Sequence, residues 1–569
     1  MSIILGLNCY HTDSSACLIK NGKLIFAIEE ERLNRIKHTS DLPLLSIEEC
    51  LKKTNTNENE ITHIAFNTNP KSNLFKKFNF LIKKLNFKNN FVKRYNDKKL
   101  LNKIFQNKFS FNDKVKFVFV EHHLAHISSA FYASNYDNAI GLSIDGSGDF
   151  TSLMIAECNN KEIKVKKRVY FPDSLGIFYH AMTQFIGFRK FGDEYKMMGL
   201  ASYGSPIYFD KLLNNLFLNS KNFFKLNLDF FNHDTINFNY SHIGAKDMPD
   251  IYTDKLDDLF KPDIANNAPE MFKKNFAASV QKIYEFYFNK ILKEINSNKF
   301  SKNLVFAGGC ALNSSANNIL LSKKFTKNIF IPVAPGDNGG CLGAAFYISK
   351  EKIVNNDFDN PFLGTAYNDV EIENIIKKKY LNKITYKKFI NENEKYDVAS
   401  NMIINNCVIG WFQDRMEFGP RALGNRSILA DPRNKNIKDL INLKIKRRES
   451  FRPFAPSVLS DFQNNWFEEI YLNQYMSSVM KAKSDKKHLI PGVVHIDGSS
   501  RVQTVLKKNN KTFHNLIYNF FLKTGVPLLL NTSFNENEPI VRSPEDAIEC
   551  LLRTNMDGLF INSFFVKKI

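Results

Sequence analysis

Three histidines lie within five positions in the stretch VEHHLAHISSAFYAS, residues 120–134, at the start of a predicted helix. His122 and His126 are four residues apart, so on a helix both imidazoles lie on one face and could bind one metal ion. His123 points about 100 degrees away from His122 around the helix axis, which leaves it out of that pair. An isolated HxxxH pattern is more often a pair of ordinary core or surface histidines, so the spacing alone leaves both readings open.

Small acidic loops between strands suggest a second chemistry, the binding of phosphate. The apolar strand IILGL leads into the polar loop NCYHTDSS and the strand ACLIK, which Asn21-Gly22 joins to KLIFAI as a hairpin. The same order recurs where AIGLSI leads into DGSGD and then FTSLMIAE. Glycine lets backbone N–H groups approach an anion and aspartate can hold a cation, so the duplication suits a two-lobed phosphate clamp. Either loop alone is more simply an ordinary turn.

Two further glycine-rich loops follow strands later in the chain. In LVFAGGCALNSSANNILL, a buried strand runs into Gly308-Gly309 and then a helix that carries Asn313 and Asn317. In IPVAPGDNGGCLGAA, Asp337 precedes a helix of small residues. A glycine pair at a strand-to-helix turn suits a nucleotide packed against the backbone, although one pair is weak support. Four such loops together favour nucleotide binding.

Arginine dominates a later stretch, DRMEFGPRALGNRSILADPRN, with Arg415, Arg421, Arg426 and Arg433 among glycines and prolines. The segments KIKRRESFRPFAP, HIDGSSRVQTV and LLLNTSFNENEP follow it. Guanidinium groups near Gly, Ser and Asn suit a bidentate grip on phosphate or carboxylate oxygens. Surface ion pairing is the alternative, which the neighbouring Gly and Pro make less favourable.

These residues need a large globular scaffold. At 569 residues the chain predicts two or more domains, and its 52 Phe and 43% hydrophobic residues supply their cores. We place the boundary near Asn355 to Pro361, which gives domains over residues 1–357 and 358–569. The strand CVIGWF opens the regular part of the second domain.

Composition excludes several classes of function. The eight Cys are scattered without a CxxC pair, which argues against zinc ribbons and disulfide frameworks. No run of eighteen apolar residues occurs and the start lacks a basic signal-peptide region, so we expect a cytoplasmic protein without a membrane partner. The formal charge of +20 comes largely from Lys/Asn/Phe-rich patches such as residues 69–108, interpreted as solvated helices. Without a basic module interleaved with base-stacking aromatics, we expect no nucleic-acid partner.

The whole chain resembles the O-carbamoyltransferases of the nodulation, cephem-antibiotic and tobramycin type. The resemblance rests on motifs that occur from end to end in the family's order. They are HTDSSACL, AIEEERLNRIKH, EHHLAHISSAFYAS, DGSGD, GDEYKMMGLASYG, AGGCALN, PGDNGG, MEFGPRALGNRSILADPR, FRPFAPSVL, RVQTV and LLLNTSFN.

The resemblance implies an α/β fold with two domains. The N-terminal domain would be of the duplicated ASKHA type, the actin-like and sugar-kinase fold, and the C-terminal domain would be YrdC-like. The C-terminal domain would join carbamoyl phosphate and ATP into carbamoyladenylate, and the N-terminal domain would pass the carbamoyl group to an acceptor hydroxyl. The composition of the second domain agrees with this division, because both substrates of the first step are anionic and that domain is rich in arginine.

The resemblance also implies a metal, iron in the best-described members, that holds the phosphate of the adenylate. The matching residues are His122, His126, Asp145 and Asp337. Imidazole and carboxylate ligands suit Fe(II), Mn(II) or Zn(II), and the spacing does not choose among these metals.

Other roles are assigned on the same motifs. His11 and Asp13 would orient or deprotonate the acceptor hydroxyl, unless His11 only caps its loop, and Lys37 with His38 either faces the acceptor or ends a solvated helix. Lys196 would meet a phosphate or form a structural ion pair. The nucleotide residues of the first domain are Asp149, Lys196, Gly308, Gly309 and Asn313. Those for carbamoyl phosphate and ATP in the second domain are Arg421, Lys446, Arg501 and Ser533, with Arg452 and Asn531 as second choices.

Two other classes of function stay open on the sequence. The chain could be another ASKHA enzyme, such as a sugar kinase or a threonylcarbamoyl transferase acting on tRNA. A sugar kinase would leave the arginine-rich second domain unexplained, and the tRNA enzyme would need a supply of threonylcarbamoyl groups. A nucleotide- or metal-sensing protein would keep the clamp without turnover. The expected partner is a small molecule with a hydroxyl group, and the resemblance suggests a homodimer.

Overall fold

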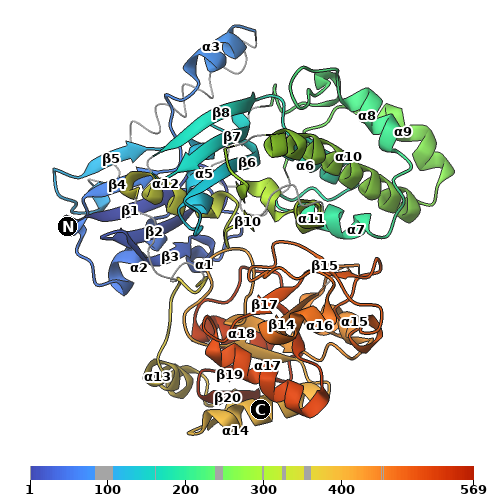
Figure 1. The fold of residues 1–569 in the computed structure, drawn as a ribbon. Coiled ribbons are helices and arrows are strands. Elements are labelled where there is room, and N and C mark those ends of the chain that lie inside the picture. The colour runs from blue at the N-terminus through green and yellow to red at the C-terminus, as the bar shows by residue number, and fades with distance from the viewer. Residues whose placement is uncertain are drawn as a thin grey trace. The chain divides into compact units, whose positions relative to one another are not determined.

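The structure is a computed structural model, and it describes most of the chain in two compact units, residues 1–358 and 359–569 (Figure 1). The described residues are 2–83, 105, 107–160, 162–236, 248–297, 300–322, 328–350, 360–449, 451–452 and 454–569. Part of the predicted boundary, residues 355–359, and part of the Lys-rich segment, residues 84–104 and 106, lie outside these ranges. Each unit has a mixed α/β fold.

The first sheet of unit 1 has the strand order β3-β2-β1-β4-β5. Its strands are β1 (Ile3–Asn8), β2 (Ser15–Lys20), β3 (Lys23–Glu29), β4 (His63–Phe66) and β5 (Lys116–Phe119). The predicted hairpins pair β1, β2 and β3 antiparallel, whereas β1, β4 and β5 run parallel. Helix α2 (Leu44–Lys53) packs against β2 and β3, and the short α1 (Glu31–Asn34) follows β3.

The second sheet of unit 1 repeats this arrangement with the order β8-β7-β6-β9-β10. Its strands are β6 (Asn138–Gly148), β7 (Thr151–Asn159), β8 (Ile163–Tyr170), β9 (Asn303–Ala307) and β10 (Asn328–Phe330). Strands β6, β7 and β8 are antiparallel neighbours, while β6, β9 and β10 run parallel. The duplicated strand pattern of the sequence is therefore a duplicated sheet.

Helices α5 (His122–Phe131) and α12 (Gly340–Ser349) join the two sheets of unit 1 (Figure 1). Helix α12 packs on β1, β2 and β4, α5 packs on β6, β7 and β9, and the two helices contact each other. The contact needs small residues, since a Cβ on Gly343 would lie 1.8 Å from the carbonyl oxygen of Ala125. Likewise a Cβ on Gly6 would lie 2.2 Å from the carbonyl oxygen of Cys341. This close packing fixes the histidine helix against the loop that carries Asp337.

A cluster of helices completes unit 1, packed around the long helix α10 (Pro269–Ser297). Its other members are α6 (Leu175–Phe185), α7 (Glu194–Ala201), α8 (Phe209–Leu216), α9 (Asp254–Asn266) and α11 (Ser314–Ser322). Helix α10 contacts all five of them. Helix α3 (Leu74–Lys83) is the described helix of the Lys-rich segment.

Unit 2 is built on one eight-stranded sheet of order β11-β20-β19-β12-β13-β18-β14-β17. Its strands are β11 (Ile384–Lys388), β12 (Ile409–Phe412), β13 (Arg426–Ala430), β14 (Ala455–Leu459), β17 (Gln503–Val505), β18 (Leu528–Ser533), β19 (Gly558–Ile561) and β20 (Phe564–Lys568). Its main helices are α13 (Asp369–Lys379), α14 (Glu392–Ile404), α15 (Ile437–Ile441), α17 (Lys511–Thr524) and α18 (Pro544–Arg553). The pairs β12–β19 and β14–β17 are parallel and the remaining neighbours antiparallel.

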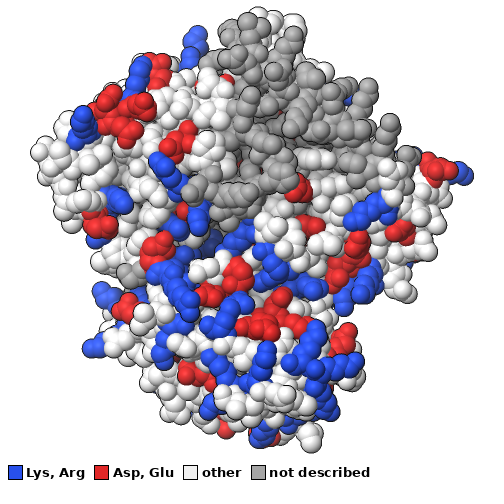
Figure 2. All heavy atoms as spheres, turned by 180° about the vertical axis from the view of Figure 1, so that it is seen from behind, with Lys and Arg blue, Asp and Glu red and all other residues white. Residues whose placement is uncertain are grey.

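The charged side chains do not segregate by sign on the face shown in Figure 2, where Lys and Arg are interspersed with Asp and Glu. Among the described residues, no helix combines the length and apolar character needed to span a bilayer.

Candidate metal centre and arginine cluster

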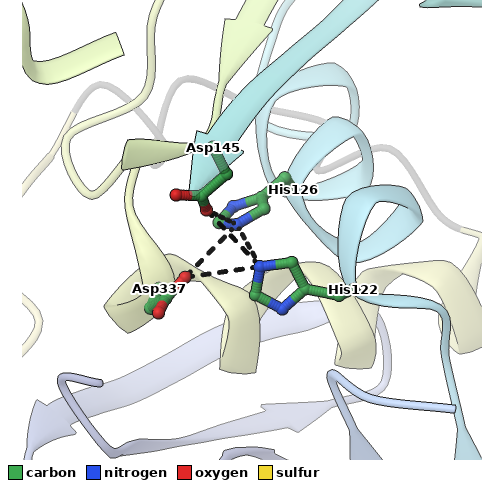
Figure 3. A group of neighbouring side chains, drawn as sticks. All are labelled: His122, His126, Asp145 and Asp337. Carbon is green, nitrogen blue, oxygen red and sulfur yellow. Dashed lines mark hydrogen bonds and ion pairs between the residues drawn. The ribbon is translucent and has the colours of Figure 1, made fainter. Parts of the chain in front are cut away.

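Four side chains from three segments of unit 1 converge on one point (Figure 3). His122 and His126 come from the first turns of α5, Asp145 from near the end of β6, and Asp337 from the short 3-10 helix η5 (Asp337–Gly339) that leads into α12. Each offers one ligand atom, and these four atoms lie within 4.8 Å of one another. We call these four residues the His/Asp tetrad.

The distances within the tetrad are those of groups that share one small cation. The Nε2 atoms of His122 and His126 lie 3.0 Å apart, and His126 Nε2 lies 2.9 Å from Asp145 Oδ2. Asp337 Oδ1 lies 3.4 Å from His122 Nε2 and 3.5 Å from His126 Nε2. Two imidazole nitrogens and two carboxylate oxygens form a donor set that suits Fe(II), Mn(II) or Zn(II).

Burial supports a cation at the tetrad. His122 and His126 are 1% and 0% exposed, and their Nδ1 atoms have no hydrogen-bond partner among the described residues. Gly148 makes room for the first ring, because a Cβ there would lie 2.1 Å from His122 Cδ2. Rings that cross so closely, with both Nε2 atoms facing two carboxylates, fit a divalent ion better than a hydrophobic core.

The charged groups of the tetrad change one another's pKa. Burial alone would lower the pKa of His122, but the hydrogen bonds to Asp145 and Asp337 raise that pKa to about 10. Burial would raise the pKa of Asp145, yet hydrogen bonds from the two histidines hold it well below its usual value. A bound cation would take the place of the protons on the histidines.

His123 lies outside the tetrad, as the helical spacing predicts. Its Nδ1 lies 2.9 Å from Ser143 Oγ and its Nε2 2.8 Å from the carbonyl oxygen of Thr151. Both ring nitrogens are therefore engaged, and burial together with the neighbouring histidines lowers the pKa of His123 well below its usual value.

The first loop, between β1 and β2, reaches the tetrad through a residue that the sequence did not single out. Thr12 Oγ1 donates to Asp337 Oδ2 at 2.8 Å. The ring of His11 lies against that of His122, with centroids 4.2 Å apart. Polar loop composition was the only signal in the sequence for Thr12, because its partner is 325 residues away.

Asp13 pairs with His38. His38 Nδ1 lies 2.8 Å from Asp13 Oδ1, and both residues have positive φ, 55° and 56°. Burial would lower the pKa of His38, but Asp13 and Glu31 raise it to about 9. Asp13, Glu31 and His38 also lie close enough to hold a cation, yet Arg32 already donates to Glu31 at 2.6 Å, so we describe this group as an ion-pair cluster. Lys37 is half-buried beside it, and its charge acts on both His38 and Glu31.

Asp149 anchors the start of the histidine helix. Its carboxylate accepts hydrogen bonds from Thr68 Oγ1, from the N–H of Asn69 and from the N–H of His122, at 3.0, 2.7 and 2.9 Å. The last of these satisfies a free N–H at the N-terminus of α5. The structure thus gives Asp149 a scaffolding contact, and its predicted contact with nucleotide stays a prediction.

The glycine pair shapes the loop beside Asp145. Gly308 has a φ of 92°, and a Cβ there would lie 2.2 Å from the carbonyl oxygen of Ile144. A Cβ on Gly309 would lie 2.9 Å from Asp145 Oδ1. Both glycines therefore permit the close approach of this loop to β6, in addition to any role toward a nucleotide.

Asn313 and Lys196 form contacts within the protein. Asn313 exchanges two hydrogen bonds with the side-chain amide of Gln281, at 3.1 and 3.2 Å. Lys196 pairs with Asp193 at 3.0 Å, which is the structural ion pair named as the alternative for this lysine.

Unit 2 brings four arginines together. The pKa of Arg501 is lowered first by burial and then by the charges of Arg421, Arg448 and Arg452. Burial also lowers the pKa of Arg421, to about 10. Arg501 Nε is buried and has no hydrogen-bond partner among the described residues. We call these four residues the arginine cluster, and like charges held this close favour an anionic ligand.

Arg448 is a member that the sequence did not single out, although it lies in the quoted segment KIKRRESFRPFAP. Its Nε donates to Asn442 Oδ1 at 2.9 Å, and its guanidinium lies 4.7 Å from the ring centre of Phe454. The run of basic residues was the signal, but spacing could not tell which of them face Arg501.

The other arginines of the Gly- and Pro-punctuated stretch have structural roles. Arg426 is fully buried and donates to the carbonyl oxygens of Gln413, Asn425, Thr365 and Asp414. Arg433 forms a bidentate pair with Asp431. For this arginine the structure therefore shows an ion pair, which was the alternative to binding phosphate. Arg415 donates to carbonyl oxygens of residues 363 and 364.

Lys446 and Ser533 contact each other in unit 2. The Lys446 ammonium donates to the carbonyl oxygens of Ser533 and Asn535 at 2.6 and 2.7 Å, and to Asn535 Oδ1 at 2.6 Å. Lys446 is 1% exposed, so it ties the end of β18 to the following loop.

Comparison with known proteins gives the family. The family model described as Carbamoyltransferase N-terminus matches residues 3–346, and the one described as Carbamoyltransferase C-terminus matches residues 400–568. Nodulation protein NolNO of Sinorhizobium fredii is 36% identical, covering 99% of this chain and 80% of its own. The uncharacterized protein sll1178 of Synechocystis is 33% identical, covering 100% of this chain and 97% of its own.

A third relative is named for its activity. The 3'-hydroxymethylcephem-O-carbamoyltransferase of Amycolatopsis lactamdurans is 30% identical over 41% of this chain and 42% of its own length. Matches to both halves of the family, in the expected order, confirm the resemblance drawn from the motifs. The chain is an enzyme of the O-carbamoyltransferase family.

Proposed function

We propose that this enzyme forms carbamoyladenylate from carbamoyl phosphate and ATP, and then transfers the carbamoyl group to a hydroxyl of a small molecule. The observation that carries the proposal is the arginine cluster, in which the charges of Arg421, Arg448 and Arg452 all act on Arg501, whose Nε is buried. Four guanidinium groups suit two polyanionic substrates. In this proposal unit 1 is of the ASKHA type and unit 2 is YrdC-like.

The first step would take place in unit 2. Carbamoyl phosphate, ATP and one water would give carbamoyladenylate, phosphate and diphosphate. Activation as an adenylate makes chemical sense, because AMP is a stabilised leaving group. The arginine cluster would hold phosphate oxygens and offset the charge that accumulates on them. Lys446 and Ser533 support this role from the end of β18, where they shape the backbone.

The second step would take place in unit 1. The acceptor oxygen forms a bond to the carbamoyl carbon, the bond from that carbon to the AMP oxygen breaks, and the hydroxyl proton passes to a base. His11 and Asp13 are the proposed residues for orienting the hydroxyl and receiving its proton, with Lys37 beside them. Their loop contacts the tetrad through Thr12, which supports a site that adjoins the metal centre.

The tetrad would hold a divalent cation in this enzyme. Bound there, the ion would supply positive charge for the phosphate of the adenylate. His122, His126, Asp145 and Asp337 would be its ligands, and Fe(II), Mn(II) and Zn(II) all suit them. The glycine-rich loops around Gly308 and Gly309 adjoin Asp145, which supports a nucleotide phosphate at the same place.

Incubation of the purified protein with ATP, carbamoyl phosphate and a panel of sugars, aminoglycosides and hydroxymethyl compounds tests the proposal. Expected products are AMP, diphosphate and an acceptor whose mass has grown by one carbamoyl group in place of hydrogen. A phosphorylated acceptor with ADP would instead identify a kinase. Tight ATP binding without AMP release under any condition would indicate a sensing protein.

A further inference from the structure

Helix α3 lies at the outer edge of unit 1 and exposes four large apolar side chains (Figure 1). Leu74, Phe75, Phe78 and Ile82 are 50%, 73%, 62% and 60% exposed. Phe78 is three or four residues from each of the others, so the four side chains lie on one helical face, which we call the apolar stripe. A contiguous exposed patch of this kind marks an interaction site, whereas single exposed apolar residues do not.

The opposite face of α3 packs against the protein. Phe80 lies two residues from Phe78 and from Ile82, which is about 200 degrees around the helix axis. Its ring packs against those of Phe150 and Phe171, with the centroids 5.5 Å apart in each pair. These contacts hold α3 on unit 1 with its apolar stripe facing outward.

The sequence around the stripe is strongly basic. Residues 69–108 contain twelve Lys or Arg and one Asp, a net charge of +11 out of the +20 of the whole chain. Among the described side chains, Lys71 precedes α3 and Lys76 lies within it, and both are exposed. An exposed apolar face bordered by lysines is typical of helices that lie in the plane of an anionic membrane surface.

We propose that α3 docks unit 1 on an anionic phospholipid bilayer. The apolar stripe enters the boundary between headgroups and acyl chains, and the lysines lie at the lipid phosphates. A second copy of the chain is a poorer occupant, because pairing two stripes would bring two segments of charge +11 together. A nucleic acid would use the lysines but not the aliphatic side chains of Leu74 and Ile82.

This inference revises the expectation that the protein has no membrane partner. That expectation followed from the lack of a spanning segment and of a signal peptide, and a helix that lies in the membrane interface needs neither. The inference does not depend on the proposed carbamoyl transfer, so the two are tested separately.

Co-sedimentation of the full-length protein with lipid vesicles tests the proposal. We expect binding to vesicles of equimolar phosphatidylcholine and phosphatidylglycerol at least about tenfold tighter than to phosphatidylcholine alone, and weaker binding at high salt. Phe75→Ser/Phe78→Ser should weaken binding to the mixed vesicles about 10- to 100-fold, because two rings no longer enter the apolar boundary. Lys71→Gln/Lys76→Gln should weaken it about 5- to 25-fold, since each lysine near the surface contributes about fivefold.

Two isoleucines of unit 1 provide a matched control, because Ile82 and Ile207 are 60% and 61% exposed. Ile82→Ser should weaken binding to the mixed vesicles at least about threefold, whereas Ile207→Ser should bind like wild type. All the side chains changed in these variants are exposed, so the midpoint of thermal unfolding should stay at the wild-type value. A loss of vesicle binding at an unchanged midpoint then comes from the membrane contact.

Several results would overturn the inference. Failure of the wild-type protein to bind the mixed vesicles would do so without any variant, as would equal binding to both kinds of vesicle. Equal losses in Ile82→Ser and Ile207→Ser would show that the stripe has no special role. A wild-type dimer that dissociates in Phe75→Ser/Phe78→Ser, without vesicle binding, would identify a second copy as the occupant, and binding of nucleic acid in place of vesicles would assign the lysines to that partner.

Discussion

The Nε2 atoms of His122 and His126 lie 3.0 Å apart. Each nitrogen carries either a lone pair or a proton, and two like groups would repel each other at this distance. The two carboxylates of Asp145 and Asp337 face the same point. This relationship is what distinguishes the tetrad from two histidines that merely fill a helical face, and it motivates the first prediction.

The double variant His122→Ala/His126→Ala should lose bound metal. Wild-type protein reconstituted with Fe(II), Mn(II) or Zn(II) should retain about one equivalent after desalting, because two imidazoles and two carboxylates supply four ligands that suit these ions. Plasma mass spectrometry measures the content. His123→Gln serves as the matched control and should keep the metal, since His123 contacts Ser143 and Thr151 instead. Equal metal content in the wild type and the double variant would refute the tetrad as a metal site.

A pair of glycine variants tests the space around His122. Gly148→Ala should weaken metal affinity about 10- to 100-fold, the range for changes that misorient a metal-binding histidine, because the new Cβ would collide with the His122 ring at 2.1 Å. Gly146→Ala, two residues away, should bind metal normally, since a Cβ there meets no atom within 4 Å. Competition with a chromophoric chelator gives both affinities. Similar losses in the two variants would point to a general effect on the loop.

Arg421→Ala should impair adenylate formation. Loss of one charge-assisted hydrogen bond costs about 1.5–3 kcal/mol, so diphosphate release from ATP and carbamoyl phosphate should slow about 10- to 150-fold. Transfer from supplied carbamoyladenylate should stay near the wild-type rate. Arg433→Ala is the control, because Arg433 pairs with Asp431 outside the cluster. If Arg421→Ala reduced both steps equally, the division of labour between the units would be wrong.

The Asp13–His38 pair should make stability depend on pH. Burial would lower the pKa of His38, but Asp13, with a contribution from Glu31, raises it from 6.5 to about 9. The pair therefore stabilises the fold fully below pH 6.5, and this stabilisation disappears as pH rises through about 9. Asp13→Asn should lower the free energy of unfolding by about 1 kcal/mol below pH 6.5. At a pH above the pKa of His38, the same substitution should lower it by much less. Urea unfolding across this range measures the difference. A loss that does not vary with pH would mean that Asp13 acts through packing alone.

Several features could be predicted from the sequence, because these features depend only on residues that are close together in the chain. The sequence shows the order of strand, loop and strand twice, and each copy lies in one of two sheets that share the same strand order. The i, i+4 spacing predicted that His122 and His126 lie on one helical face and that His123 points away from it. The motifs, through their order along the chain, identified the carbamoyltransferase family.

Only the tertiary structure decided which charged residues meet. Thr12 lies 325 positions from Asp337, and the two contact each other because α12 packs against β1 at glycines. Arg426 and Arg433 resemble Arg421 in sequence, yet Arg426 donates to backbone carbonyls and Arg433 pairs with the buried carboxylate of Asp431. Arg448 joins Arg501 from a segment in which any of several basic residues could have done so. The physical reason is that a sheet edge or a helix crossing brings together residues whose separation along the chain carries no information about their distance in space.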